Sequence, residues 1–206
     1  MTPPLGVILA GGLATRMGGG DKGLLSLGGQ SLMARVIERL GPQVAGLAIN
    51  ANGDPARFAD LGLPVLHDSV AGFAGPLAGV LAGLDWAAIE GAEAIVTAAA
   101  DTPFFPCDLV PRLQLAGEGM AAPLVLAASR DAERGVVRHP TFGLWPVALR
   151  ADLRAALESG LRKVVLWTDR HGGREALFET GRFDPFFNVN TPADLARAEA
   201  LLEGAP

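Results

Sequence analysis

The sequence predicts an α/β fold, a three-layer α/β/α arrangement of the Rossmann-like kind with a mainly parallel sheet and helices on both faces. Two observations carry this prediction. Short apolar runs alternate with stretches of helical period along most of the chain. Polar residues follow the apolar runs directly, as they do at strand ends in doubly wound sheets. The length of 206 residues, half of them hydrophobic, fits one domain over residues 1–206.

The first half of the chain begins with an apolar run over residues 6–10, which has the length of a buried strand. Residues 31–40 place apolar side chains on one helical face, with Ser31 as the N-cap and Gly41-Pro42 as the stop. The other elements predicted here are a strand over 44–49, a short helix over 54–61, a strand over 64–67, a helix over 75–88 and a strand over 94–100.

The second half continues the alternation less regularly. Residues 161–168 fit a helix or a strand by period, and we favour the helix. Thr191 is the expected N-cap of the last helix, with Pro192 in its first position and Asp194 in its first turn. The remaining predictions are helices over 108–115 and 151–158 and strands over 123–128, 139–144 and 183–189.

A glycine-rich loop follows the first strand. It contains Gly11 and Gly12, three further glycines at 18–20, and the cations Arg16 and Lys22. Glycines let backbone N–H groups approach an anion closely, and fixed cations beside them suit a polyphosphate. A glycine-rich hairpin with solvated charges is the structural alternative. We favour an anion-binding loop.

The spacing of this loop argues against two better-known phosphate loops. Asp21 precedes Lys22 and Gly23 follows it, so the Gly-Lys-Ser/Thr of a P-loop is absent. The glycines at 18, 20 and 23 satisfy G-x-G-x-x-G, but they stand too far from the strand for a dinucleotide fold. The next strand also ends in Asn50 rather than in a carboxylate, which disfavours a nicotinamide oxidoreductase.

Four polar strand ends are predicted to meet at one rim of the sheet: Gly11, Asn50, Asp68 and Asp101. Asp101 follows the most apolar strand, where an unpaired carboxylate would be costly, so either Mg²⁺ or a local turn would satisfy it. The lysine loop on the same rim favours the metal. Asp68 could likewise form only a turn. The amides of Asn50 and Asn52 suit a base or a ribose, but also a simple turn.

Composition excludes several classes of function. A net charge of −5 argues against a nucleic-acid-coating surface. No run approaches the ~18 apolar residues of a membrane span, and one cysteine permits no internal disulfide, so a cytoplasmic protein is expected. The three histidines stand far apart and no hydrolase motif is evident, which disfavours zinc or serine-nucleophile chemistry.

The segments Leu9-Ala-Gly-Gly12, Arg16-Met-Gly18 and Asp21-Lys22 resemble the signature of nucleotidyltransferases with the nucleotide-diphospho-sugar transferase fold. Further segments make the chain similar to one family of these enzymes, the molybdenum cofactor guanylyltransferases. They are Ile49-Asn-Ala-Asn52, His67-Asp-Ser69, Gly75-Pro-Leu-Ala-Gly79, Asp101-Thr-Pro103, His139-Pro-Thr141 and Phe187-Asn-Val-Asn-Thr-Pro192.

The resemblance implies transfer of GMP from GTP to molybdopterin carrying molybdenum, with release of pyrophosphate. It implies nucleotide contacts from Leu9, Ala10, Gly11, Gly12, Lys22, Asn50, Asp68 and Asp101. Arg16, Lys22 and Asp101 would be catalytic, and Asp101 would hold Mg²⁺. Asn188 and Asn190 would lie toward the pterin. Glycine at position 11, where the sister cytidylyltransferases have alanine, favours guanine.

The resemblance further implies transient contact with other cofactor-biosynthesis proteins and with acceptor molybdoenzymes. Two other functions stay open. One is transfer to molybdopterin from CTP, or to a sugar phosphate, by an enzyme of the same fold. The other is a non-catalytic nucleotide or cofactor carrier, against which the presence of Arg16, Lys22 and Asp101 speaks.

Overall fold

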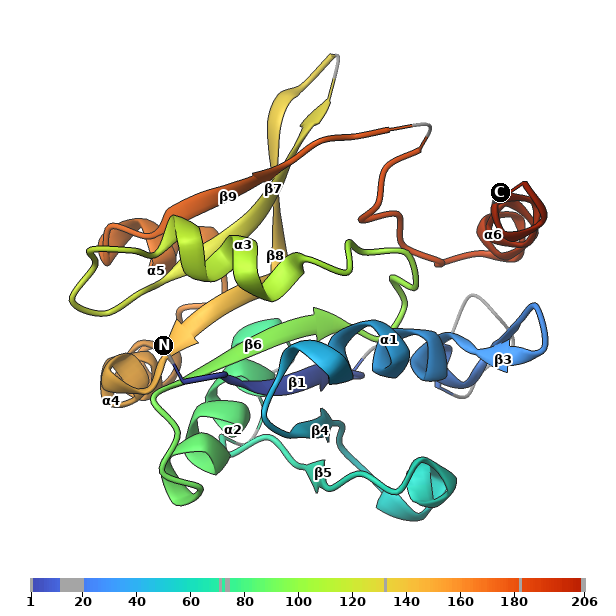
Figure 1. Ribbon diagram of the computed structural model, residues 1–206. Helices are drawn as coiled ribbons and strands as arrows, with labels where there is room; N and C mark the ends of the chain where they lie inside the picture. Colours follow the sequence, from blue (N-terminus) through green and yellow to red (C-terminus); the bar gives the residue numbers. More distant parts are fainter. Residues whose placement is uncertain are drawn as a thin grey trace.

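The protein is described here from a computed structural model that covers residues 2–11, 21–70, 72, 75–131, 133–181 and 183–204. These residues form a seven-stranded sheet with the order β5-β4-β1-β6-β8-β7-β9 and a separate hairpin, β2-β3 (Figure 1). The strands of the sheet are β1 (Leu5–Leu9), β4 (Leu47–Asn50), β5 (Val65–Leu66), β6 (Ala94–Ala99), β7 (Val125–Asp131), β8 (Gly135–Pro146) and β9 (Arg174–Phe178).

The sheet is mainly parallel. β1 pairs in parallel with both β4 and β6, β5 with β4, and β9 with β7. β8 alone among these seven runs antiparallel to its neighbours β6 and β7. The carboxyl ends of β1, β4, β5 and β6 therefore lie at one edge, where the sequence placed its polar strand ends.

Helices cover both faces of the sheet (Figure 1). α1 (Leu32–Leu40) and α3 (Leu109–Ala116) share one apolar cluster with the side chains of one sheet face, such as Ile8 and Val96. α2 (Pro76–Ile89), α4 (Arg150–Glu158) and α5 (Val164–Arg170) share a second cluster with Val7 and Ile95 from the opposite face. The alternation of side chains along β1 and β6 produces these two cores. The predicted α/β/α fold class is confirmed.

Local signals determine where several helices begin. The Ser31 side chain accepts a hydrogen bond from the Ala34 backbone N–H at 3.0 Å and caps α1. Thr191 and Asp194 form a capping box at the start of α6 (Pro192–Glu203), as predicted. The region over 161–168 is helical from Val164, in agreement with the favoured interpretation.

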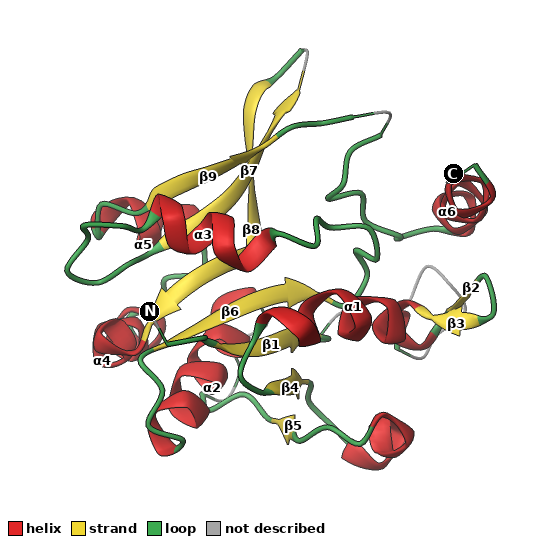
Figure 2. Cartoon of the chain, viewed as in Figure 1, coloured by secondary structure: helices red, strands yellow, loops and turns green. Residues whose placement is uncertain are grey.

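One predicted strand was wrong, and one strand of the sheet was not predicted. Residues 183–189 were expected to form a strand, but those described there are turn and irregular backbone (Figure 2). Their apolar side chains fill the core instead: Phe183 and Val189 join a third cluster around Leu27 and Phe104. The strand that was not predicted is β9, which pairs in parallel with β7. Its short sequence has exposed polar residues at its start and a weak period.

The chain also contains small elements that the sequence did not reveal. The hairpin strands β2 (Ser26–Leu27) and β3 (Gln30–Ser31) are too short to show a period. The helix expected over 54–61 is the 3₁₀ helix η4 (Pro55–Leu61). Other 3₁₀ helices are η2 (Lys22–Leu24), η3 (Gly41–Gln43) and η5 (Val147–Leu149). None of the helices in the described part of the chain is long and apolar enough to cross a membrane.

Candidate active site

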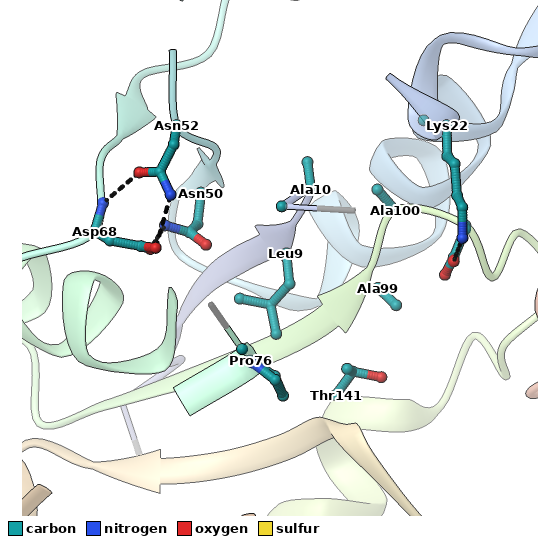
Figure 3. Close-up of a pocket in the computed structure, with 14 residues that line it drawn as sticks. Leu9, Ala10, Lys22, Asn50, Asn52, Asp68, Pro76, Ala99, Ala100 and Thr141 are labelled. Carbon is teal, nitrogen blue, oxygen red and sulfur yellow. Dashed lines mark hydrogen bonds and ion pairs between the residues drawn. The ribbon is translucent and has the colours of Figure 1, made fainter. Parts of the chain in front are cut away.

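A cavity of about 360 Å³ opens at the carboxyl edge of the sheet, beside the start of α2. Backbone and side chains from the ends of β1, β4 and β6 form its walls (Figure 3). Its lining residues are Leu9, Ala10, Gly11, Lys22, Gly23, Asn50, Asn52, Asp68, Gly75, Pro76, Ala99, Ala100, Asp101 and Thr141. Seven of the predicted site residues thus meet around one cavity, because parallel strands bring their carboxyl ends together.

One end of the cavity holds an ordered carboxylate. Asp68 Oδ1 accepts a hydrogen bond from Asn50 Nδ2 at 3.0 Å, and Asp68 Oδ2 accepts one from Asn52 Nδ2 at 2.7 Å (Figure 3). The Asn52 amide oxygen in turn accepts from the Asp68 backbone N–H at 3.0 Å. Both amides therefore serve to orient Asp68. Each carboxylate oxygen keeps the capacity to accept a further donor from a ligand.

Glycines make room at this end of the cavity. A Cβ at Gly79 on α2 would lie 2.2 Å from the Asn50 amide oxygen, so only glycine lets the helix pass this close to Asn50. Among the residues that the structure describes, a Cβ at Gly11 would meet no atom within 4 Å, and the Gly11 backbone is not in the left-handed region. Packing within the described part of the chain therefore does not require glycine at position 11, which lines the cavity.

The opposite end of the cavity carries Lys22 (Figure 3). The carboxylate of Asp101 lies beside this lysine. Lys22 Nζ donates a hydrogen bond to Asn190 Oδ1 at 2.6 Å and lies 3.6 Å from Asp101 Oδ2. Burial raises the pKa of Asp101 above its usual value, and the charge of Lys22 opposes that shift without cancelling it. A further cation beside Asp101 would therefore stabilise its ionised form.

The segment that carries Asn188 and Asn190 lies against Asp101 and Thr102. The Thr102 hydroxyl donates to Asn188 Oδ1 at 2.5 Å, and the Val189 N–H donates to the Asp101 carbonyl at 2.8 Å. Neither asparagine lines the cavity. Both instead hold its charged end in place, one through Lys22 and the other through Thr102.

Metal binding would depend on Asp101. Within the described residues, no group of three or more His, Cys, Asp and Glu side chains could hold a metal ion. Mg²⁺ needs no such group, because it commonly binds one or two carboxylates together with phosphate oxygens and water. The half-buried carboxylate of Asp101, which lies beside Lys22 at the cavity, fits that requirement.

Two predicted site residues, Gly12 and Arg16, lie outside the described residues. Sequence reasoning missed others that shape the cavity, among them Thr141 on β8 and Pro76 at the start of α2. Both belong to segments that carried the family resemblance, which was the available signal. Asn52 was noted as a polar strand-end residue, but its role in orienting Asp68 depends on a contact across 16 positions.

Comparison with protein families gives one match over most of the chain. Residues 6–172 match the family model described as "MobA-like NTP transferase domain". The chain is 57% identical over 197 residues to a protein from Cereibacter sphaeroides named molybdenum cofactor guanylyltransferase, with 96% of each chain covered. It is 50% identical to a protein of the same name from Mesorhizobium japonicum, covering 96% of this chain and 95% of that one.

Solved structures share the fold at lower identity. Molybdopterin-guanine dinucleotide biosynthesis protein A from Archaeoglobus fulgidus matches with a TM-score of 0.72 and 23% identity, over 98% of this chain and all of the other. A 4-diphosphocytidyl-2C-methyl-D-erythritol synthase from Anaerococcus prevotii matches with a TM-score of 0.74 and 13% identity, over 98% and 96%. At these identities the matches establish the architecture.

Proposed function

The chain belongs to the MobA-like NTP transferase family, and we propose that it transfers GMP from GTP to molybdopterin carrying molybdenum, releasing pyrophosphate. The family membership confirms the resemblance seen in the sequence. One structural observation supports this reaction above the others. A single cavity has an oriented carboxylate, Asp68, at one end and the pair of Lys22 and Asp101 at the other. A nucleoside triphosphate has the matching polarity, with a base at one end and charge at the other.

Asp68 supports guanine as the base. Guanine presents two neighbouring donors, its N1–H and its N2 amino group, and these match the two oxygens of one carboxylate. The Watson–Crick edge of cytosine has one amino donor beside acceptors, so cytosine would leave one carboxylate oxygen facing an acceptor. Because Asn50 and Asn52 hold Asp68 in place, the carboxylate would not turn away to accommodate the wrong base.

Lys22 supports the transfer step. The terminal phosphate of molybdopterin would attack the α-phosphorus of GTP, forming one P–O bond as the bond to the pyrophosphate oxygen breaks. A phosphate monoester is largely dianionic at neutral pH, so no residue has to remove a proton. The barrier lies in bringing anions together, which positioned positive charge lowers. Lys22 Nζ, held by Asn190, would supply that charge at a fixed point.

Asp101 is the residue that would hold Mg²⁺. A bound Mg²⁺ would neutralise phosphate charge and orient the phosphate oxygens. The residue's own contribution is a carboxylate at the charged end of the cavity, fixed through its backbone by Val189. Asn188 and Asn190 are proposed to border the acceptor, because they lie beside the lysine that the attacking phosphate must approach.

The proposal is tested with GTP labelled at either the α- or the γ-phosphate, molybdopterin and Mg²⁺. Transfer of GMP moves the α-label into the pterin product and leaves the γ-label in pyrophosphate. Phosphoryl transfer would move the γ-label instead, and that result would contradict the proposal. Tightly bound GTP that stays intact with the acceptor present would indicate a carrier.

Nucleotide preference is tested separately by thermal stabilisation. A ligand that binds only the folded state raises the melting temperature by mass action. We expect a larger shift with GTP and Mg²⁺ than with CTP or ATP at equal concentration. A larger shift with CTP, together with CMP transfer, would assign the protein to the cytidylyltransferases.

The protein is expected to act in the cytoplasm.

A further inference from the structure

Arg57 lies outside the cavity lining but contacts both segments that build the cavity's two ends. It belongs to η4, and its Nε lies 2.6 Å from Asp21 Oδ2. Asp21 immediately precedes Lys22. On its other side, an Arg57 guanidinium nitrogen donates to the backbone oxygen of Asn52, the residue whose side chain orients Asp68. One guanidinium therefore connects the Asp68 end to the Lys22 end.

The Arg57 side chain is itself held on several sides. A second guanidinium nitrogen donates to the Asp54 backbone oxygen at 3.0 Å. The guanidinium carbon lies 4.7 Å from the ring centroid of Phe58, which is 1% exposed. The two partners of the ion pair are largely withdrawn from water, with 28% of the Arg57 side chain and 12% of the Asp21 side chain exposed. Screening by solvent is therefore weaker here than at an exposed pair.

Asp21 passes this constraint to the lysine through the backbone. Its carbonyl oxygen accepts from the Leu24 N–H at 3.1 Å, which closes the turn that contains Lys22. A Cβ at Gly23 would lie 2.7 Å from Met33 and 3.2 Å from Ala100, so this turn packs closely against its surroundings. The position of Asp21 thus influences where the long Lys22 side chain starts.

We propose that Arg57 is a positioning residue. By holding Asp21 and the Asn52 backbone together, it sets the distance between Lys22 and the Asp68 end of the cavity. The inference rests on the proposed function, because the spacing matters only for a ligand that reaches both ends. Misplacing a charged group by about 1 Å from its productive position can cost about 100-fold in rate. Arg57 acts through Asp21 and Asn52.

The first test is kinetic and uses a closely matched control. Arg112 on α3 also pairs with an aspartate (Asp108), donates to a backbone oxygen (Leu177) and stacks on a phenylalanine (Phe178), but it contacts no residue of the cavity. We expect Arg57→Ala and Asp21→Asn each to lower kcat about tenfold, and Arg112→Ala to leave kcat unchanged. Arg57→Lys should recover only part of the loss, because an ammonium cannot make the forked contacts.

The double variant examines whether the pair acts as a unit. Arg57→Ala combined with Asp21→Asn should lower kcat no further than Arg57→Ala alone, since both changes remove the same connection. Losses that multiply would overturn the inference. It would also be overturned if Arg57→Ala and Arg112→Ala lowered kcat equally at equal loss of melting temperature.

A second test does not depend on activity. Lys22 and Lys163 are the only lysines in the sequence, and Lys163 is exposed, whereas 19% of the Lys22 side chain is exposed. Acylation of the folded full-length protein, read by mass spectrometry, gives the ratio of Lys22 to Lys163 labelling. We expect this ratio to rise severalfold in Arg57→Ala and Asp21→Asn but not in Arg112→Ala.

The two tests separate the inference from the function on which it rests. An unchanged labelling ratio in Arg57→Ala overturns the positioning role whatever the activity. If the wild-type protein transfers no GMP while Arg57→Ala still raises the ratio, the proposed reaction fails and the coupling of Arg57 to Lys22 stands.

Discussion

Lys22 Nζ and Asn190 Oδ1 lie 2.6 Å apart, although 168 positions separate the two residues in the sequence. Lys22 follows the glycine-rich loop near the start of the chain, and Asn190 precedes the last helix. The contact joins an early and a late segment of the sequence at the charged side of the cavity. The segment that precedes α6 therefore helps to position Lys22 at the cavity.

Because Asn190 only positions Lys22, substitution of Lys22 should lower kcat more than substitution of Asn190. Lys22→Ala should lower kcat for GMP transfer by about 100-fold or more, because it removes positive charge from the transition state. Asn190→Ala keeps the charge but frees the side chain, so we expect a loss of about tenfold. Steady-state kinetics with GTP check this order. A normal rate for Lys22→Ala, in a variant with an unchanged melting temperature, would remove Lys22 from the mechanism.

Asp101 should make stability depend on pH in a definite direction. Burial raises its pKa in the folded protein, so the folded state binds a proton more readily than the unfolded chain. That contribution to stability is complete at pH values below the ordinary aspartate pKa and is lost as pH rises through the raised folded value. Asp101→Asn, which stays neutral, should avoid this loss.

Melting temperatures of the wild type and Asp101→Asn across pH 3 to 8 test this sign, with the window set around the usual aspartate pKa. As pH rises, the melting temperature of Asp101→Asn should increase relative to that of the wild type. GMP transfer by the variant should be abolished throughout. If the melting temperature of the wild type instead increased relative to that of the variant, the pairing of Asp101 with Lys22 would outweigh the effect of burial on the Asp101 pKa.

Gly11→Ala should change nucleotide selection without changing the fold. The added methyl group would meet no atom of the described residues within 4 Å and would lie at the cavity wall, so its effect is expected to fall on the ligand. We expect kcat/KM for GTP to fall relative to CTP. Gly41→Ala is the control, because its methyl group likewise has no neighbour within 4 Å in the part of the chain that the structure describes, and Gly41 does not line the cavity. An unchanged ratio of GTP to CTP use would dissociate position 11 from base choice.

Asp85 on α2 should affect GTP binding more than the transfer step. It accepts a hydrogen bond from Ser69, the neighbour of Asp68, and two from Arg154 on α4 at 2.7 and 2.9 Å. Asp85→Ala should make the segment that carries Asp68 and Ser69 more mobile. It should therefore raise KM for GTP severalfold while kcat changes little. Asp152→Ala is the control, since it breaks two side-chain hydrogen bonds to Trp167 and His171 away from the cavity. Equal effects of both variants on KM would indicate general destabilisation.

The sequence by itself determined the layers of the fold and the rim on which the site lies. Apolar periodicity and end signals such as Ser31 and Thr191 act over a few residues, so strands and helices could be identified from local sequence. The parallel alternation then required Gly11, Asn50, Asp68 and Asp101 to meet at one edge, and they do. Where the local signal was weak, as between β9 and residues 183–189, the prediction failed.

The tertiary structure alone decided what each site residue contacts. That Asn52 orients Asp68, that Asn190 holds Lys22 and that Arg57 joins Asp21 to the Asn52 backbone all depend on pairings between distant segments. Sequence periodicity and motif spacing do not reveal such pairings, because the pairings depend on the order of the strands in the sheet and on how the loops pack at its edge. Short-range propensities specify the elements, and their packing places the polar side chains within hydrogen-bonding distance.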